Sequence, residues 1–253
     1  MSTVILLRGL TREHGHWGDF VAQLQAALPA GYQVLTPDLP GNGDLHLSSS
    51  PTRVEAMVAS CRQQLREQHH PPPYHVVAMS LGAMVTVAWA AGHPQELASC
   101  ALINTSLRPF SPFWHRLRPA QYPRIARLLL TRASALEWER TIMAMTTRHP
   151  LNEADSLSSW LRIRAQRPVH TRNGLRQLLA AVRYQAPQQA PNVPMLLLNG
   201  LGDRLVHPDC SAVLAARWQV PLIRHPTAGH DLPLDATPWL VQHLQAWLAS
   251  PHR

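Results

Sequence analysis

The segment HVVAMSLGAM, residues 75–84, is an apolar run typical of a buried strand that leads directly into a helical pattern. Ser80 stands at the turn between the two. A serine held there projects from the sheet, and the backbone N–H of Leu81 is directed at the oxygen that the serine attacks. The pattern therefore predicts a nucleophilic serine. The segment alone is equally consistent with a structural hydroxyl in an ordinary strand-to-helix turn, so the choice depends on partner residues elsewhere.

Two such partners follow in the chain. Residues 194–200, PMLLLNG, predict a buried parallel strand, and Asp203 comes just after its carboxyl end. A shorter strand-like run, 220–225, is followed by a loop that presents His230. The order serine, acid, histidine is one of the known orders of a catalytic triad and differs from those of two protease families. We therefore predict a triad in which Asp203 orients His230, the general base for Ser80.

Other histidines and carboxylates fit these roles less well. His225 ends the predicted strand, and His207 precedes a proline at an apparent helix start, where we expect it to be exposed. Asp231 and Asp235 are spare carboxylates near the base. Asp38 is expected to brace a Pro-Gly turn. None of them replaces Asp203 as the acid or His230 as the base.

The chain resembles the α/β-hydrolase superfamily over nearly its whole length outside the middle. Residues 8–10, Arg-Gly-Leu, are similar to the His-Gly-x oxyanion turn of that family, and DLPGNG, 38–43, is similar to its Asp-x-Pro-Gly-x-Gly loop. The resemblance implies that the backbone N–H groups of Leu10 and Leu81 form the oxyanion hole. It also implies a helical cap inserted after the strand that follows the elbow helix.

Two positions depart from the family pattern. Ala78 stands where the family usually has glycine, and Arg8 stands where it usually has histidine. The alanine adds only a methyl group, so we expect the elbow to form. A guanidinium offers different hydrogen bonds from an imidazole, so the support of the oxyanion turn is expected to differ. We interpret Arg8 as a structural anchor, with contact to an anionic part of the substrate as the alternative.

Strands alternate with helical patterns along most of the 253 residues. This alternation predicts an α/β fold with a mostly parallel sheet and crossover helices. Because the first strand already carries the oxyanion turn, we expect the α/β-hydrolase fold without its N-terminal hairpin, with about six strands. The expected strands are 3–8, 33–38, 74–79, 98–104, 194–199 and 220–225.

The middle of the chain breaks the alternation. It shows helical periodicity in pieces, such as 125–130, 135–140 and 175–179, and no convincing strand. We expect a helical cap over residues 107–187, between a first part of the hydrolase core, 1–106, and a second part, 188–253.

Positive charge is concentrated in the expected cap. The chain has no lysine, and 14 of its 23 arginines lie within residues 108–183 against four acids, a net charge of +10. Most of them are individually expected to form a solvated face. Together they create a field that attracts an anionic substrate or an acidic acyl carrier protein. The pimeloyl-carrier-protein methyl ester esterases are similar in size and layout. Nucleic acid is not an expected partner, since no nucleic-acid module is visible.

Composition excludes several classes of protein. No stretch approaches the length of a membrane span, and the N-terminal residues are not typical of a signal peptide. Cys61, Cys100 and Cys210 are few and far apart, which favours buried thiols in a reducing, cytoplasmic compartment. Residues 14–16, His-Gly-His, have no carboxylate or cysteine cluster at ligand spacing, and no nucleotide-binding glycine loop is present. We therefore expect neither a metal nor an organic cofactor.

The expected activity is that of a carboxylesterase for small to medium acyl esters, acting through an acyl-enzyme on Ser80. A serine in place of a carboxylate nucleophile argues against dehalogenase and epoxide hydrolase chemistry. One alternative is an esterase or thioesterase acting on an acyl group held by an acidic carrier protein docked on the cap. The other is a non-catalytic binding protein on the same fold. Fold and triad do not choose the leaving group.

Overall fold

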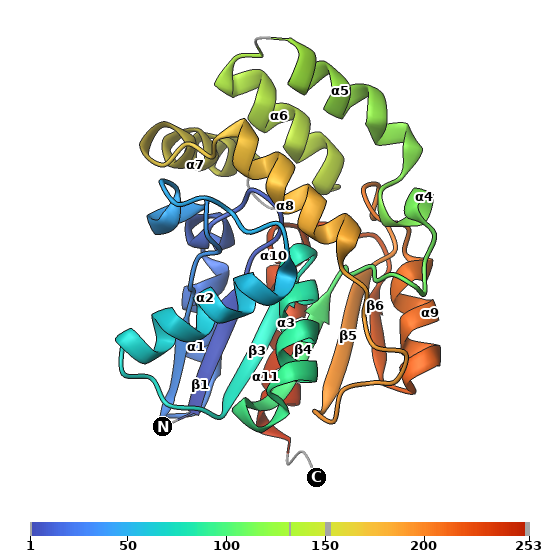
Figure 1. Cartoon of the computed structure of the whole chain (residues 1–253). Coiled ribbons are helices and arrows are strands. Elements are labelled where there is room, and N and C mark those ends of the chain that lie inside the picture. Colours follow the sequence, from blue (N-terminus) through green and yellow to red (C-terminus); the bar gives the residue numbers. More distant parts are fainter. Residues whose placement is uncertain (1, 132, 150–152, 251–253) are drawn as a thin grey trace.

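The computed structural model describes residues 2–131, 133–149 and 153–250, in which six strands form one sheet (Figure 1). Their order is β2-β1-β3-β4-β5-β6, and all neighbours pair in parallel. The predicted parallel sheet of six strands is confirmed. The strands are β1 (Ser2–Leu7), β2 (Tyr32–Leu35), β3 (Tyr74–Met79), β4 (Leu97–Ile103), β5 (Met195–Gly200) and β6 (Leu222–His225).

The second strand is shorter than predicted. It ends at Leu35 and not at residue 38. Pro37 explains the difference, because proline has no N–H to donate to the neighbouring strand.

Helices cover both faces of the sheet because its strands alternate buried side chains between them. In β1, Val4 and Leu6 join one core cluster, and Ile5 and Leu7 join the other. The first cluster is covered by α1 (Phe20–Ala27) and α11 (Thr237–Ala249). The second is covered by α2 (Val54–Glu67), α3 (Leu81–Gly92) and α9 (Asp209–Trp218) (Figure 1).

All six strands end at the same edge of the sheet, since all are parallel. The loops after β1, β3, β5 and β6 carry the predicted oxyanion turn, Ser80, Asp203 and His230, so they meet at this edge. The chain runs from β1 outward to β2 and then back to β3 on the other side of β1. This reversal of strand order is where open parallel sheets form their binding crevice.

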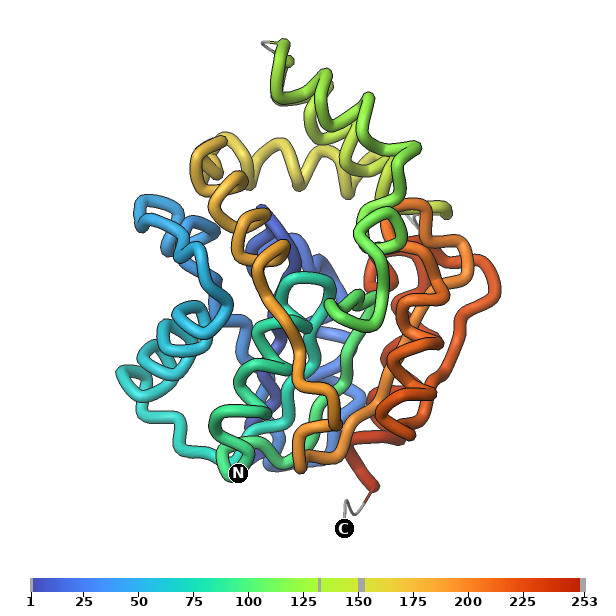
Figure 2. Tube along the Cα trace, turned by 45° about the vertical axis from the view of Figure 1, so that its right-hand side comes forward, coloured from blue at the N-terminus to red at the C-terminus, as the bar shows by residue number. Residues whose placement is uncertain are grey.

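A helical insertion between β4 and β5 lies over that edge (Figures 1 and 2). Within the described residues it contains no strand, so the predicted helical cap is confirmed. Its exact limits, residues 107 and 187, stay a prediction. Its helices are α4 (Phe113–Arg116), α5 (Tyr122–Leu130), α6 (Ala135–Thr146), α7 (Glu153–Gln166) and α8 (Thr171–Arg183).

Ion pairs join the cap to the core. Glu139 of α6 is 2% exposed, and its carboxylate accepts from Arg12 of the core at 2.7 Å and from Arg164 of α7 at 3.1 Å. Arg167, just after α7, pairs with the buried Glu13. Arg176 of α8 donates to the backbone carbonyl of residue 50. Arg164, Arg167 and Arg176 therefore do not belong to the expected solvated face, because their guanidinium groups bond to buried acceptors.

The remaining structural expectations concern membranes and thiols. None of the helices in the described part of the chain is both long and apolar enough to cross a membrane. Cys61, Cys100 and Cys210 are buried and free, as expected for small apolar side chains. Burial raises the pKa of the Cys61 thiol to about 12, which makes this thiol unreactive.

Candidate active site

Ser80 occupies the strained turn that its sequence context predicts. Its φ and ψ are 53° and −117°, between the end of β3 and the start of α3, and its N–H donates to the carbonyl of Ile103 in β4. Gly82 is required beside it, since a Cβ there would lie 2.5 Å from the carbonyl oxygen of Leu7. The elbow thus forms with Ala78, whose side chain is fully buried in the sheet core.

The predicted oxyanion turn lies against the serine. A Cβ on Gly9 would lie 3.1 Å from Cβ and 3.5 Å from Oγ of Ser80, so only glycine leaves this space open. Thr11, with φ 56°, donates its backbone N–H to Oε1 of Gln177 in α8 at 2.8 Å. Among the described residues, no group accepts a hydrogen bond from the N–H of Leu10 or Leu81. Both donors are available to a bound oxygen.

Asp203 and His230 form a buried pair. Nδ1 of His230 lies 2.7 Å from Oδ2 of Asp203, and the two side chains are 4% and 2% exposed. Because a carboxylate only accepts, Nδ1 carries the proton and Nε2 is left as the basic nitrogen. The other carboxylate oxygen accepts from the N–H groups of Leu205 and Val206 at 2.8 and 2.9 Å, which fixes the acid.

Electrostatics make the imidazole more basic. Burial disfavours the charged imidazolium of His230, but the charge and hydrogen bond of Asp203 and the charge of Asp231 outweigh it. The pKa of His230 is therefore raised above its ordinary value, although the Arg8 charge opposes the change.

Two further residues hold the histidine loop: Asn104, which the sequence patterns did not identify, and Asp235, which they left as a spare carboxylate. Nδ2 of Asn104, at the end of β4, donates to the carbonyl oxygens of Gly229 and His230 at 3.0 and 2.7 Å. Its Oδ1 accepts from the N–H of Gly200 in β5. Asp235 accepts the N–H of Gly229 at 2.7 Å. For Asn104, the only local signal in the sequence was its position as a polar residue at the end of a buried strand.

Arg8 is buried, and its partner is Asp231, which the sequence left as a spare carboxylate. Nη2 and Nη1 of Arg8 donate to the two carboxylate oxygens at 2.7 and 3.1 Å. The side chain is thus an anchor between two loops, as interpreted from the sequence.

The other sequence candidates have structural partners. Nδ1 of His225 accepts the N–H of Ala228 at 2.9 Å, so it supports the loop before the base. His207 is half-buried, not fully exposed, and stacks on His115 with ring centroids 4.4 Å apart. Asp38 accepts the N–H of Asp44 at 3.0 Å and so braces its turn as predicted.

One group of side chains near the cap has the composition of a metal site. His14, Asp38 and Asp44 place ligand atoms within 4.8 Å of one another, a proximity that the sequence spacing did not reveal. Nδ1 of His14 already bonds Oδ2 of Asp38 at 2.7 Å, and the Arg167 guanidinium lies 3.7 Å from Asp44. A neighbouring guanidinium repels a cation, so the group is better described as an ion-paired network.

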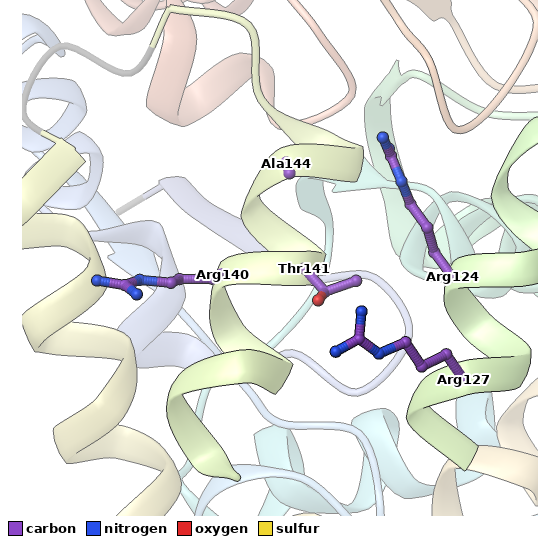
Figure 3. A pocket seen from close by; sticks show the side chains of 5 residues that line it. All are labelled: Arg124, Arg127, Arg140, Thr141 and Ala144. Carbon is purple, nitrogen blue, oxygen red and sulfur yellow. The ribbon is translucent and has the colours of Figure 1, made fainter. Parts of the chain in front are cut away.

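A groove of about 260 Å³ lies between α5 and α6, away from the candidate triad. It is lined by Arg124, Arg127, Arg140, Thr141 and Ala144. In Figure 3, the Arg127 side chain extends from α5 toward Thr141 of α6, and Arg140 points to the opposite side of α6. Three of its five lining residues are arginines, and α5 and α6 are the cap helices farthest from the sheet (Figure 1).

Known proteins resemble this chain in sequence and in fold. Pimeloyl-[acyl-carrier protein] methyl ester esterase of Aromatoleum aromaticum is 29% identical over 86% of the chain and 88% of that protein. The same-named protein of Chromobacterium violaceum is 34% identical, over 42% of the chain and 37% of that protein. A thermophilic esterase from Thermogutta terrifontis shares the fold, with a TM-score of 0.76 at 20% identity over 98% of this chain and 89% of that one. The family model of the alpha/beta hydrolase fold matches residues 2–237, so the chain belongs to the α/β-hydrolase family and is a hydrolase of that fold.

Proposed function

We propose that the protein is a serine esterase that hydrolyses carboxylic esters of small to medium acyl chain through an acyl-enzyme on Ser80. The strongest support is the buried Asp203–His230 hydrogen bond at the sheet edge where Ser80 occupies its strained turn. The acceptor-free N–H groups of Leu10 and Leu81 add the oxyanion donors that acyl transfer needs.

The proposed mechanism follows from these positions. Nε2 of His230 takes the proton of Ser80 as its Oγ attacks the ester carbonyl, and Asp203 stabilises the imidazolium. The oxyanion is held by the N–H groups of Leu10 and Leu81. His230 then protonates the departing alcohol. Water, activated by the same base, releases the acid and restores the serine.

Apolar side chains of the cap support an acyl substrate. Four side chains of α8 at helical spacing share one side of that helix and are 38–55% exposed: Leu175, Leu178, Leu179 and Val182. Phe113 and Trp114 of α4 are also exposed, at 67% and 49%. Exposed apolar surface of this kind is typical of a surface that binds a ligand or a partner.

The direct test is hydrolysis of p-nitrophenyl esters of two to twelve acyl carbons by the wild type and Ser80→Ala. We expect turnover that is lost in the variant and falls with long chains. Ser250→Ala, an exposed serine at the end of α11, is the matched control and should keep full activity. A serine-directed phosphonate should label Ser80 stoichiometrically. Absence of both turnover and labelling would favour the non-catalytic binding protein.

A second candidate function has its own support. The groove between α5 and α6 offers the guanidinium groups of Arg124 and Arg127 to an acidic partner, and the relatives found by sequence are named for substrates on an acyl carrier protein. The carrier would present its acyl ester or thioester to the same Ser80. Salt-sensitive binding separates this function from free-ester hydrolysis.

A further inference from the structure

The guanidinium of Arg8 lies between the two loops that carry the nucleophile and the base. Arg8 directly follows β1, and its side chain is 3% exposed. Its Nη1 donates to Sδ of Met79 at 3.0 Å and to Oδ1 of Asp231 at 3.1 Å. Its Nη2 donates to Oδ2 of Asp231 at 2.7 Å. Trp17 covers one face of the group, with 4.8 Å between Cζ and the ring centroid.

The two partners of Arg8 are the direct neighbours of the candidate nucleophile and base. Met79 precedes Ser80, and Asp231 follows His230. One rigid group therefore connects three segments: the oxyanion turn, the elbow and the histidine loop. Asp231 is fixed on its other side as well, because its N–H donates to the carbonyl of Thr146 in the cap at 2.8 Å.

We propose that the buried Arg8–Asp231 ion pair is a positioning device that sets His230 relative to Ser80. The inference rests on the proposed function of the triad. A guanidinium suits the task because its planar fork binds a carboxylate at two points and so fixes orientation as well as distance. Burying two charged groups away from water costs free energy, and two apolar side chains at the same place would avoid this cost. The position of the Arg8–Asp231 pair is therefore better explained by its effect on the geometry of the site than by its contribution to the stability of the fold alone.

The pair also balances charge around the base. Asp203 faces His230 from the loop after β5, Asp231 is its neighbour, and Arg8 faces it from the loop after β1. The backbone of the preceding Gly229 contacts Asp235 of α10 (Leu232–Asp235) and packs close to Arg148 of the cap. Loss of Arg8 leaves Asp231 unopposed and makes His230 more basic. Loss of the Asp231 charge leaves Arg8 unopposed and makes His230 less basic.

Four variants test the proposal: Arg8→Met, Asp231→Asn, the double variant and Arg8→Lys. The pKa of His230 is read from its Cε1 proton by NMR titration, with the resonance assigned by its loss in His230→Gln. We expect this pKa to rise in Arg8→Met, to fall in Asp231→Asn and to stay near the wild-type value in the double variant. Arg8→Lys keeps the charge but not the fork. It should lower kcat for p-nitrophenyl acetate about tenfold, with little change in KM or in the pKa of His230.

A matched pair elsewhere provides the control. Arg62 donates to both carboxylate oxygens of Glu96, which lies beyond the end of α3 opposite Ser80. Arg62→Met should lower the melting temperature but leave kcat and the pKa of His230 unchanged. If Arg8→Met behaves like this control, or if Arg8→Lys keeps full kcat, the positioning role is wrong. The NMR titration needs no substrate. An enzyme without esterase activity would therefore refute the proposed function, whereas a Ser80-dependent esterase without these shifts would refute only this inference.

Discussion

Arg167 of the cap binds both carboxylate oxygens of Glu13 of the core, with Nε 2.9 Å from Oε2 and Nη2 2.5 Å from Oε1. The Glu13 side chain is 2% exposed. Glu13 lies only three residues after Leu10 of the oxyanion turn, so the cap is attached to the core close to the candidate site. The end of α7 is thus held by a buried carboxylate.

We expect Arg167→Gln to lower the free energy of unfolding by about 1 to 3 kcal/mol, because it leaves the buried Glu13 carboxylate without its charged partner. Chemical denaturation measures this loss. Trypsin should also cleave the cap of the variant faster. Arg127→Gln is the control: its ion pair with Glu137 is exposed, at 74% and 53% for the two side chains, and contributes little. Equal stability of the two variants would show that the Glu13 pair does not hold the cap.

Gly9→Ala should lower kcat about tenfold or more. The new Cβ would lie 3.1 Å from Cβ of Ser80, so either the oxyanion turn or the nucleophile must shift. Steady-state kinetics on p-nitrophenyl acetate measure the effect. Gly92→Ala, at the end of α3, is the matched control, since its added methyl meets nothing within 4 Å. Unchanged kcat in Gly9→Ala would contradict the place assigned to the oxyanion turn.

The pH profile should reflect the raised pKa of His230. Only the neutral imidazole can take the proton of Ser80, so kcat/KM falls as the pH drops through this pKa, which lies above the ordinary value of about 6.5. Asp203→Asn removes the charge and the carboxylate acceptor that raise it. The acid limb should then move to lower pH, and kcat should fall about 10⁴-fold, as in other triads. An acid limb that stays in place would exclude His230 as the base.

Local patterns explain why the fold was predictable and why the three candidate triad positions can be named from the sequence. The buried strands appear as short apolar runs, and Ser80, Asp203 and His230 each follow one of them at a turn. Long-range partners leave no such pattern. Arg8 and Asp231 are 223 residues apart, and Thr11 and Gln177 are 166 apart, so neither pair produces a periodicity. For the same reason the sequence does not distinguish one cap arginine from another, because only the fold decides which of them meet a buried acid.

Arg124 and Arg127 allow a test of the carrier-protein function that leaves the triad intact. Both are exposed on α5 and line the groove against α6. An acidic acyl carrier protein should bind the wild type more weakly as NaCl rises from 50 to 500 mM. The double variant Arg124→Gln/Arg127→Gln should weaken binding about fivefold, which corresponds to about 0.5 kcal/mol for each exposed contact.

A charge-matched control separates this groove from the general charge of the cap. Arg172→Gln/Arg183→Gln removes two exposed arginines of α8 and should bind the carrier nearly as the wild type does. Hydrolysis of p-nitrophenyl acetate should be unchanged in both double variants, because none of the four residues contacts the triad. If both variants lose affinity equally, the carrier responds only to net charge. If neither does, the groove is not its docking site, and the free-ester function is favoured.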